Sequence, residues 1–237
     1  MMNGVTFGSK HSYRDWGLIL KSRPVISPPS PKTVYIDIPA SDGVIDLTES
    51  LTGDVKFENR TITCEFNVLN ARSEWSSIYS DILGFLHGQQ MKVIFDEDPT
   101  YCYMGRFKVN EWKSDKKTST ITIEGNVEPY KLEMFSSLED WVWDIFNFET
   151  GIAREYGNIR VDGNLTFTIE GNRKSVVPYF IVQSDDGTGM KVKFNGTIYN
   201  LSDGTNRVLN INLKEGMNTL YFIGTGTVSI DYRGGRL

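Results

Sequence analysis

The clearest alternation of apolar and polar residues lies between positions 33 and 127, with the period of two that is typical of β-strands buried on one face. In the stretch 33–39, Val34, Ile36 and Ile38 alternate with a tyrosine and an aspartate, so these three side chains are expected to be buried. The strands expected from this pattern span 33–39, 55–57, 60–69, 91–95, 101–112 and 118–127. Of these, 101–112 is expected to form a β-hairpin arm.

One stretch repeats its apolar residues at helical spacing. The members of this stripe are Trp75, Ile78, Tyr79, Ile82, Leu83 and Leu86. Positions i, i+3, i+4, i+7, i+8 and i+11 share one face of an α-helix, which predicts a single helix buried on that face. We expect Asn70 to cap its beginning and Gly88 to end it.

Proline interrupts the pattern before the first of these strands. The stretch 22–32, SRPVISPPSPK, holds four of the eight prolines. Proline fixes φ and lacks a backbone donor, which excludes a helix or a central strand here. This stretch is expected to be a surface loop or an arm.

The sequence pattern changes in the second half of the chain, where short apolar stretches alternate with turn residues. The expected turns include Asp162-Gly163-Asn164, Gly171-Asn172, Asp185-Asp186-Gly187, Asn195-Gly196, Ser202-Asp203-Gly204, Glu215-Gly216 and Gly224-Thr225-Gly226. A spacing of about 8 to 12 residues between turns is typical of antiparallel sandwiches. We expect domains at 1–135 and 136–237, the second a galectin-like or jelly-roll β-sandwich whose first strand is 141–148.

Composition and charge narrow the function classes. The 237 residues are 39% hydrophobic and 23% charged, which is ordinary for a globular protein. A net charge of −5 argues against specific nucleic-acid binding, and the apolar runs are too short to cross a bilayer. No secretory signal is recognisable at the N-terminus, so Cys64 and Cys102 are expected to be reduced core residues rather than a disulfide.

The sequence contains no clear pattern for a catalytic or a metal site. The two histidines, His11 and His87, stand in separate segments, and both are expected to have structural roles. The acidic run 96–98 and the pair 185–186 are better explained as solvated turns than as cation sites. Since no phosphate-binding glycine motif is present either, we expect no enzyme activity, no metal and no cofactor.

The segment 7–20, FGSKHSYRDWGLIL, places several aromatic side chains close to the N-terminus. Together with its flanks it resembles the start of the distal tail proteins of long-tailed bacteriophages. The C-terminal stretch 215–222 and the following strand Val228–Tyr232 resemble the last hairpin of the galectin-like domain of that family. The resemblance therefore extends over nearly the whole chain.

This resemblance implies a mainly β fold and an assembly function. It implies an N-terminal β-sandwich-like, ring-forming domain with one α-helix and a β-hairpin arm. Members of this family form a hexameric ring that joins the tail tube to the tail tip or baseplate. The implied partners are further copies of the chain, the tail tube protein, the tape measure, tail-tip proteins and a receptor-binding protein, in the virion tail after assembly in the host cytoplasm.

The segment 7–20 and the stretch 101–112 are the expected contacts between subunits, because extended segments pair with a neighbour's exposed sheet edge. The candidate interface residues are Phe7, Tyr13, Trp16, Leu18, Tyr101 and Tyr103. Aromatic anchors dominate many interfaces, but packing within the same subunit explains these residues equally well.

Carbohydrate binding by the C-terminal sandwich is the alternative function, with glycans of the host cell surface as ligands. Aromatic rings offer flat faces to sugars, and the candidate residues are Trp143, Tyr179, Tyr199 and Tyr221. Alternating aromatic residues in sandwich strands also serve as core, so the sequence leaves both interpretations open.

Overall fold

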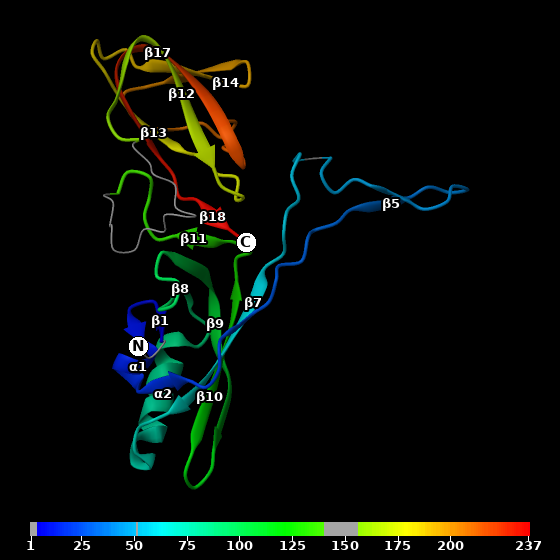
Figure 1. The fold of residues 1–237 in the computed structure, drawn as a ribbon, viewed down its shortest axis with the longest axis vertical. Helices are drawn as coiled ribbons and strands as arrows, with labels where there is room; N and C mark the ends of the chain where they lie inside the picture. The colour runs from blue at the N-terminus through cyan, green and yellow to red at the C-terminus, as the bar shows by residue number, and fades with distance from the viewer. Residues whose placement is uncertain (1–3, 51, 140–155) are drawn as a thin grey trace. The chain divides into compact units, whose positions relative to one another are not determined.

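The computed structural model describes residues 4–50, 52–139 and 156–237, and these form two compact units. The first unit comprises the chain up to Asp98, the stretch Cys102–Lys131 and the last residue, Leu237. The second comprises Pro99–Tyr101 and Leu132–Arg236, so the units divide a few residues before the expected position 136. The protein is mainly β with antiparallel sheets, as expected from the alternation (Figure 1).

The first unit is built on one antiparallel sheet with the strand order β2-β1-β8-β9-β10-β7-β3, and β4 also pairs with β7. Its elements are β1 (Val5–Phe7), β2 (Lys10–His11), α1 (Ser12–Trp16), β3 (Leu18–Leu20), β4 (Val25–Ile26), β5 (Tyr35–Asp37), β6 (Val44–Asp46), β7 (Arg60–Val68), the 3-10 turn η1 (Arg72–Glu74), α2 (Trp75–Leu86), β8 (Gln90–Phe95), β9 (Tyr101–Ser114) and β10 (Ser119–Val127). The stretch 101–112 is therefore one strand inside this sheet, and the arm expected there lies elsewhere.

Helix α2 and the sheet bury a common core. Ile82 and Leu86 of the helix are fully buried in one cluster with Phe66, Phe107 and Ile121 from the strands. The i, i+4 spacing places the two helix residues on one face of α2, and the period of two places the apolar residues of each strand on one face of the sheet. Burying such a side chain contributes about 1.5–3 kcal/mol, so this cluster is the main source of stability of the unit.

Of the two residues expected at the ends of α2, Gly88 has the expected role and Asn70 does not. Gly88 has φ 75°, and its N–H donates to Phe107 O at 2.7 Å, which confirms that it ends the helix. Asn70 does not cap the beginning, because η1 intervenes between it and the helix. Its carbonyl oxygen instead accepts a hydrogen bond of 2.9 Å from Nε1 of Trp75.

The segment 7–20 forms part of the first unit and does not project from it. Strand β1 pairs with β8, and β3 pairs with β7. Between them lies α1, a short helix that the sequence analysis missed. His11 caps it, since Nδ1 accepts hydrogen bonds from the backbone N–H groups of Tyr13 and Arg14 at 3.1 and 3.2 Å. Gly17 ends it with φ 65°.

Cys64 and Cys102 are both buried, as expected for core residues, and no disulfide joins them. Burial raises the pKa of Cys64 from 9.0 to about 12, so the thiol is protonated at neutral pH. Because the unfolded chain ionises this thiol around pH 9, its contribution to stability is complete below that pH and is lost as the pH rises toward 12.

We therefore expect Cys64 to resist iodoacetamide at pH 8 in the folded protein and to react fully in denaturant. Mass spectrometry of digested samples, quenched at intervals, measures this difference. The exposed thiol of glutathione in the same tube serves as the control for reagent activity. Alkylation of Cys64 in native protein as fast as in denaturant would contradict the burial.

The second unit has a sheet with the order β15-β14-β17-β13-β16, and β12 pairs along β17. Its strands are β11 (Lys131–Glu133, starting at the boundary), β12 (Ile159–Gly171), β13 (Tyr179–Ser184), β14 (Met190–Phe194), β15 (Thr197–Leu201), β16 (Gly204–Arg207), β17 (Gly216–Asp231) and β18 (Gly235–Arg236). Phe180, Val192 and Phe222 are fully buried in its core. The expected strand 141–148 lies outside the described residues.

Two expected turns of this unit are not turns. Gly224-Thr225-Gly226 lies inside β17, and Asp162-Gly163-Asn164 lies inside β12, where Gly163 pairs with Gly224. Gly226 has φ 149°, and a Cβ there would lie 2.3 Å from Gln183 O of the neighbouring strand. Glycine therefore serves close packing here, and the expected last hairpin is one continuous strand.

Candidate assembly surface

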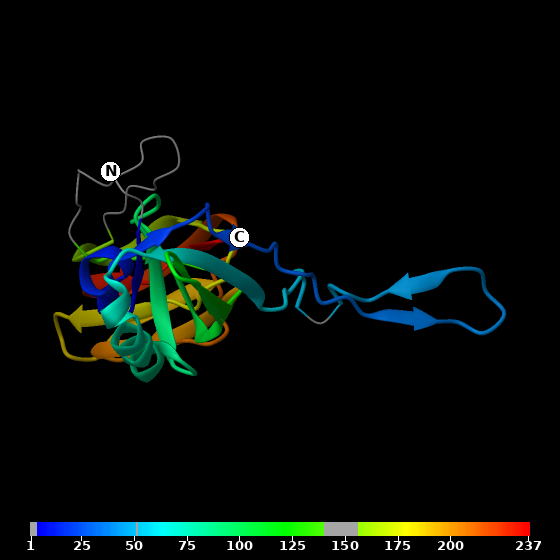
Figure 2. The same ribbon diagram turned by 90° about the horizontal axis from the view of Figure 1, so that it is seen from below.

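A two-stranded ribbon, residues 33–48, projects from the first unit and is named the arm here (Figures 1 and 2). Strands β5 and β6 pair in the register Tyr35↔Asp46, Ile36↔Ile45 and Asp37↔Val44. The ribbon is continued toward its root by Leu47 N–H donating to Val34 O at 2.8 Å. Backbone pairing therefore maintains the arm without a second layer.

The register gives the two faces of the arm different chemistry. Directly opposed residues share a face, so Ile36 and Ile45 lie together with Val34 on an apolar face. The other face combines Tyr35 and Val44 with carboxylates. The alternation expected for the stretch 33–39 is thus present, but its apolar side chains are not buried.

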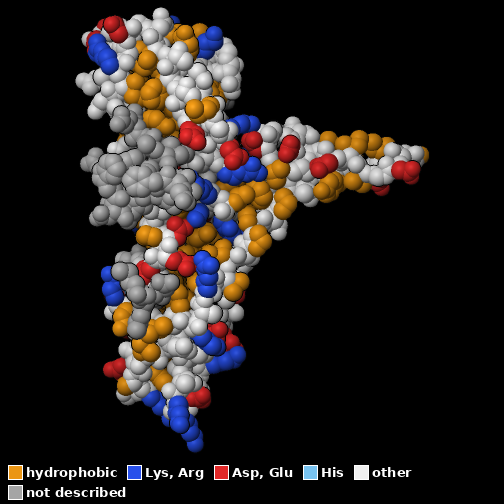
Figure 3. Space-filling model, in the orientation of Figure 1, with side chains coloured by type: hydrophobic (Ala, Val, Ile, Leu, Met, Phe, Trp, Pro, Cys, Tyr) orange, Lys and Arg blue, Asp and Glu red, His pale blue; other side chains and the backbone are white. Residues whose placement is uncertain are grey.

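The arm exposes more apolar surface than a folded chain usually leaves to water. Val34, Ile36 and Ile45 are 50%, 48% and 47% exposed, and Val44 is 59% exposed. Figure 3 shows hydrophobic side chains along both margins of the arm. A contiguous apolar patch of this kind marks an interaction surface.

The arm is attached to the sheet by paired backbone. Lys32 N–H donates to Lys56 O at 2.7 Å, and Glu58 N–H donates to Ser30 O at 2.8 Å. Phe57 lies against Tyr130 with ring centroids 6.1 Å apart. The proline-rich stretch 22–32, expected to be a loop or an arm, forms the edge strand β4 and then one side of this root.

Most of the sequence-predicted interface residues lie inside the first unit. Phe7 and Leu18 are 0% exposed, and Trp16 and Tyr103 are also buried. The phenol ring of Tyr103 lies 5.0 Å from the guanidinium of Arg60. Burial raises the pKa of Tyr103, and the charge of Arg60 partly opposes this. In the single chain these four side chains pack within the subunit. This is the alternative to an interface role that the sequence analysis left open.

Tyr13 and Tyr101 remain accessible to different degrees. Tyr13, on α1, is 42% exposed. Tyr101 is half-buried, with the guanidinium of Arg236 at 5.8 Å from its ring. Of the six candidates, Tyr13 alone presents a largely exposed aromatic ring.

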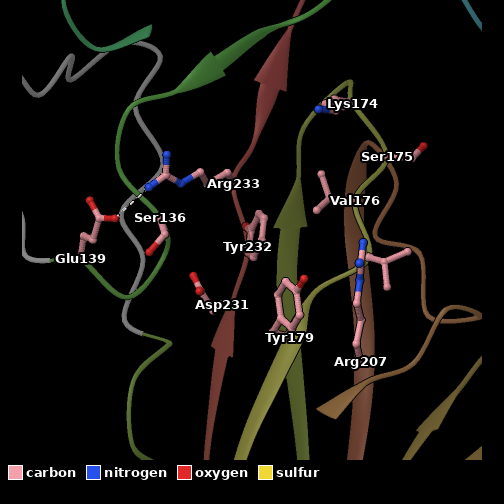
Figure 4. Close-up of a pocket in the computed structure, with 11 residues that line it drawn as sticks. Ser136, Glu139, Lys174, Ser175, Val176, Tyr179, Arg207, Asp231, Tyr232 and Arg233 are labelled. Carbon is pink, nitrogen blue, oxygen red and sulfur yellow. Dashed lines mark hydrogen bonds and ion pairs between the residues drawn. The ribbon is translucent and has the colours of Figure 1, made fainter. Parts of the chain in front are cut away.

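Tyr179 lines an open hollow of about 540 Å³ in the second unit (Figure 4). The Arg207 guanidinium lies 5.1 Å from its ring, and Arg233 forms an ion pair of 3.0 Å with Glu139. Oδ1 of Asp231 is buried and accepts no hydrogen bond from the residues that the structure describes. An aromatic ring among charged groups is a chemistry that binds polar ligands.

Of the other glycan candidates, Tyr199 and Tyr221 do not line this hollow. Tyr199 packs against the core of the unit, and Trp143 lies outside the described residues. Tyr221 is exposed on β17, whereas Tyr179 pairs with Asp231 near the end of the same strand. Ten residues of strand separate these two rings by on the order of 30 Å, so one sugar cannot contact both.

The acidic stretch 96–98 follows β8 as a turn that is exposed at Asp96 and Glu97, and its carboxylates pair with basic side chains. Oδ2 of Asp96 lies 3.1 Å from Nε2 of His11, and Asp98 lies 2.6 Å from Nζ of Lys131. Glu97 pairs with Arg23 at 3.3 Å. No metal-binding group of histidines, cysteines or acids occurs among the described residues, and no described helix is long and apolar enough to span a membrane.

The comparisons with known proteins rest on the fold. Neither a known family nor a curated protein matches the sequence. Among solved structures, SPP1 Dit (gp 19.1) matches with a TM-score of 0.57 and 12% identity, over 100% of both chains. That phage protein is described as a paradigm of the hub adsorption apparatus in phages that infect Gram-positive bacteria.

The chain has the fold of a distal tail protein. The recognition made from the two ends of the sequence is thereby confirmed at the level of the fold, over the full length. At 12% identity the fold alone carries over, so the role of each residue rests on the structure of this chain.

Sequence reasoning missed the arm as a candidate site, although two signals were present. The prolines at 28, 29 and 31 stop the sheet from continuing into the stretch 33–39. The return strand 44–46 carries the apolar pair Val44 and Ile45 beside the tip Ser41-Asp42-Gly43. An apolar hairpin directly after a proline-rich root is the pattern that would have found it.

Proposed function

We propose that the chain is a structural protein of a phage tail, a distal tail hub whose hexameric ring joins the tail tube to the tail tip or baseplate. The observation that carries this proposal is the likeness to SPP1 Dit over the whole length of both chains. It supports a structural role in the virion tail.

The arm supports assembly from this chain alone. A closed ring uses heterologous contacts, in which one patch meets a different patch of the next subunit. An element that leaves its own unit with an exposed apolar face suits such a contact, because covering its half-exposed aliphatic side chains removes apolar surface from water. The arm is therefore the proposed ring contact, with Tyr13 and Tyr101 as further candidates.

The other partners follow from the proposed position in the tail. They are the tail tube protein and the tape measure on one side, and tail-tip and receptor-binding proteins on the other. Phe7, Trp16, Leu18 and Tyr103 would support the ring by stabilising the unit that carries the arm.

We expect the purified chain to form sixfold rings of six 26.9 kDa subunits as its concentration increases. Size-exclusion chromatography with light scattering measures the mass, and negative-stain microscopy shows the symmetry. In the matched control, residues 33–48 are replaced by a short Gly-Ser turn, which leaves the paired root intact. This control should remain monomeric and folded, and a wild-type chain that is monomeric at high concentration would contradict the proposal.

Glycan binding by the second unit is the second candidate, and the hollow beside Tyr179 favours it. Binding of a host glycan would be lost in Tyr179→Ala and kept in Tyr221→Ala, because only the first ring lines the hollow. A glycan array probed with both variants separates this function from the hub, whose assembly neither substitution should change.

A further inference from the structure

The first unit has a second unassigned surface, an open hollow of about 750 Å³ at the end of the sheet beside α2. Trp75 and Tyr79 of the helix and Trp112 of β9 form its apolar wall. The rings of Tyr79 and Trp112 lie edge to face with centroids 4.1 Å apart. The hollow is therefore aromatic and held in shape by its own packing.

Basic side chains surround this aromatic wall. Arg72 and Lys116 line the hollow, and neither forms an ion pair with any residue that the structure describes. Asp115 also lines it; its carboxylate accepts hydrogen bonds from Lys117 N and Thr118 N at 2.6 and 2.7 Å, and these bonds, with a smaller effect of the Arg72 charge, lower its pKa. Figure 3 shows blue side chains gathered at the end where the β9–β10 turn lies.

The arm has the opposite chemistry. It carries Asp37, Asp42 and Asp46 and has no lysine or arginine between positions 33 and 48. No ion pair involves these carboxylates in the described part of the chain, and Oδ1 of Asp46 accepts a hydrogen bond from Thr48 N–H. An apolar, acidic ribbon and an aromatic, basic hollow on the same unit are complementary in both respects.

The two surfaces lie on different sides of the first unit. Figures 1 and 2 both show the arm leaving the sheet in a direction away from α2. A contact between the arm of one copy and the hollow of another is therefore head to tail. Head-to-tail contacts are the kind that close a ring.

We propose that the arm of one subunit docks into the Trp75–Tyr79–Trp112 hollow of the next copy of the chain. This inference rests on the proposed function, and it names the surface that receives the arm. The apolar face of the arm meets the aromatic rings, while Asp42 at its tip faces Arg72 and Lys116. Docking thus covers the exposed isoleucines and brings Asp42 to the two basic side chains of the hollow.

Cysteine cross-linking tests the contact directly. Ser41→Cys places a thiol at the tip of the arm, and Ser114→Cys places one at the hollow, both in exposed positions. With a short bifunctional maleimide, a mixture of the two single variants should give covalent dimers, and the double variant should give a ladder of up to six chains. Wild-type protein, whose two cysteines are buried, is the control for background.

Charge reversal gives an independent readout. Asp42→Lys and Lys116→Glu should each raise the concentration of half-assembly about tenfold, and combining them in one chain should restore most of the loss. Asp162→Lys and Lys193→Glu, exposed residues of the second unit, are the matched controls and should change it less than about twofold.

The outcomes separate the two proposals. If the wild-type chain forms no ring, the proposed function fails. If it forms rings but the mixed variants do not cross-link, or Ser41→Cys alone cross-links arm to arm, the ring stands and the docking site is overturned. Cross-links of arm to hollow together with charge rescue support the docking.

Discussion

Phe7→Ala is expected to lower the free energy of unfolding of the first unit by about 3–5 kcal/mol. The phenyl ring is 0% exposed and lies 5.6 Å from the ring of Phe107 and 6.3 Å from those of Trp16 and Phe66, measured between centroids. Removing it opens a cavity among three aromatic rings, which α1, β7 and β9 carry. Guanidinium denaturation followed by tryptophan fluorescence measures the change.

The experiment belongs in the variant without the arm, so that assembly does not contribute to stability. Tyr13→Ala is the matched control, because this aromatic residue of the same segment is 42% exposed and should change the free energy by less than about 0.5 kcal/mol. If Phe7→Ala left the stability of the armless variant unchanged and abolished ring formation in the full chain, Phe7 would be an interface residue, and its assignment to the core would be wrong.

Gly226→Ala is expected to destabilise the second unit by about 3 kcal/mol or more. The substitution combines two penalties, a φ of 149° that L side chains rarely adopt and a Cβ placed 2.3 Å from Gln183 O and 2.7 Å from Ser184 Cα. Those atoms belong to the backbone of the paired strand β13, which cannot move without opening the sheet.

Gly187→Ala separates the two penalties. Gly187 has φ 70° in an exposed turn, and a Cβ there would meet nothing within 4 Å, so only the conformational cost of about 1–2 kcal/mol applies. Thermal unfolding of both variants by calorimetry gives the comparison. Equal destabilisation would mean that Gly226 lies in an open turn, as the sequence suggested, and not inside β17.

Local patterns predicted much of the secondary structure. The period of two located β7, β8 and β10, and the helical stripe located α2 with its end at Gly88. These predictions succeeded because backbone geometry fixes which residues share a face, whatever covers that face later. The short helix α1 escaped, because its five residues are too few for a periodic signal.

Glycine was less informative, because it has two uses that look alike in a sequence. Asn195-Gly196 and Asp185-Asp186-Gly187 are turns, where positive φ is needed for the chain to reverse. Gly224 and Gly226 also have positive φ, but they lie within a strand. Only the neighbouring strand, which leaves no room for a Cβ, distinguishes the second use from the first.

The sequence alone determined the mainly β class, the helix at 75–86, the alternation in the stretch 33–39 and the resemblance of both ends to distal tail proteins. The tertiary structure decided which of these faces are buried. Phe7 and Leu18 are buried in the core of the first unit, whereas Ile36 and Ile45 have the same apolar character and remain exposed. The reason is physical: periodicity states which side chains point the same way, but burial depends on a second element that arrives from elsewhere in the chain. For the arm the described chain provides no such element, and we propose that the next subunit does.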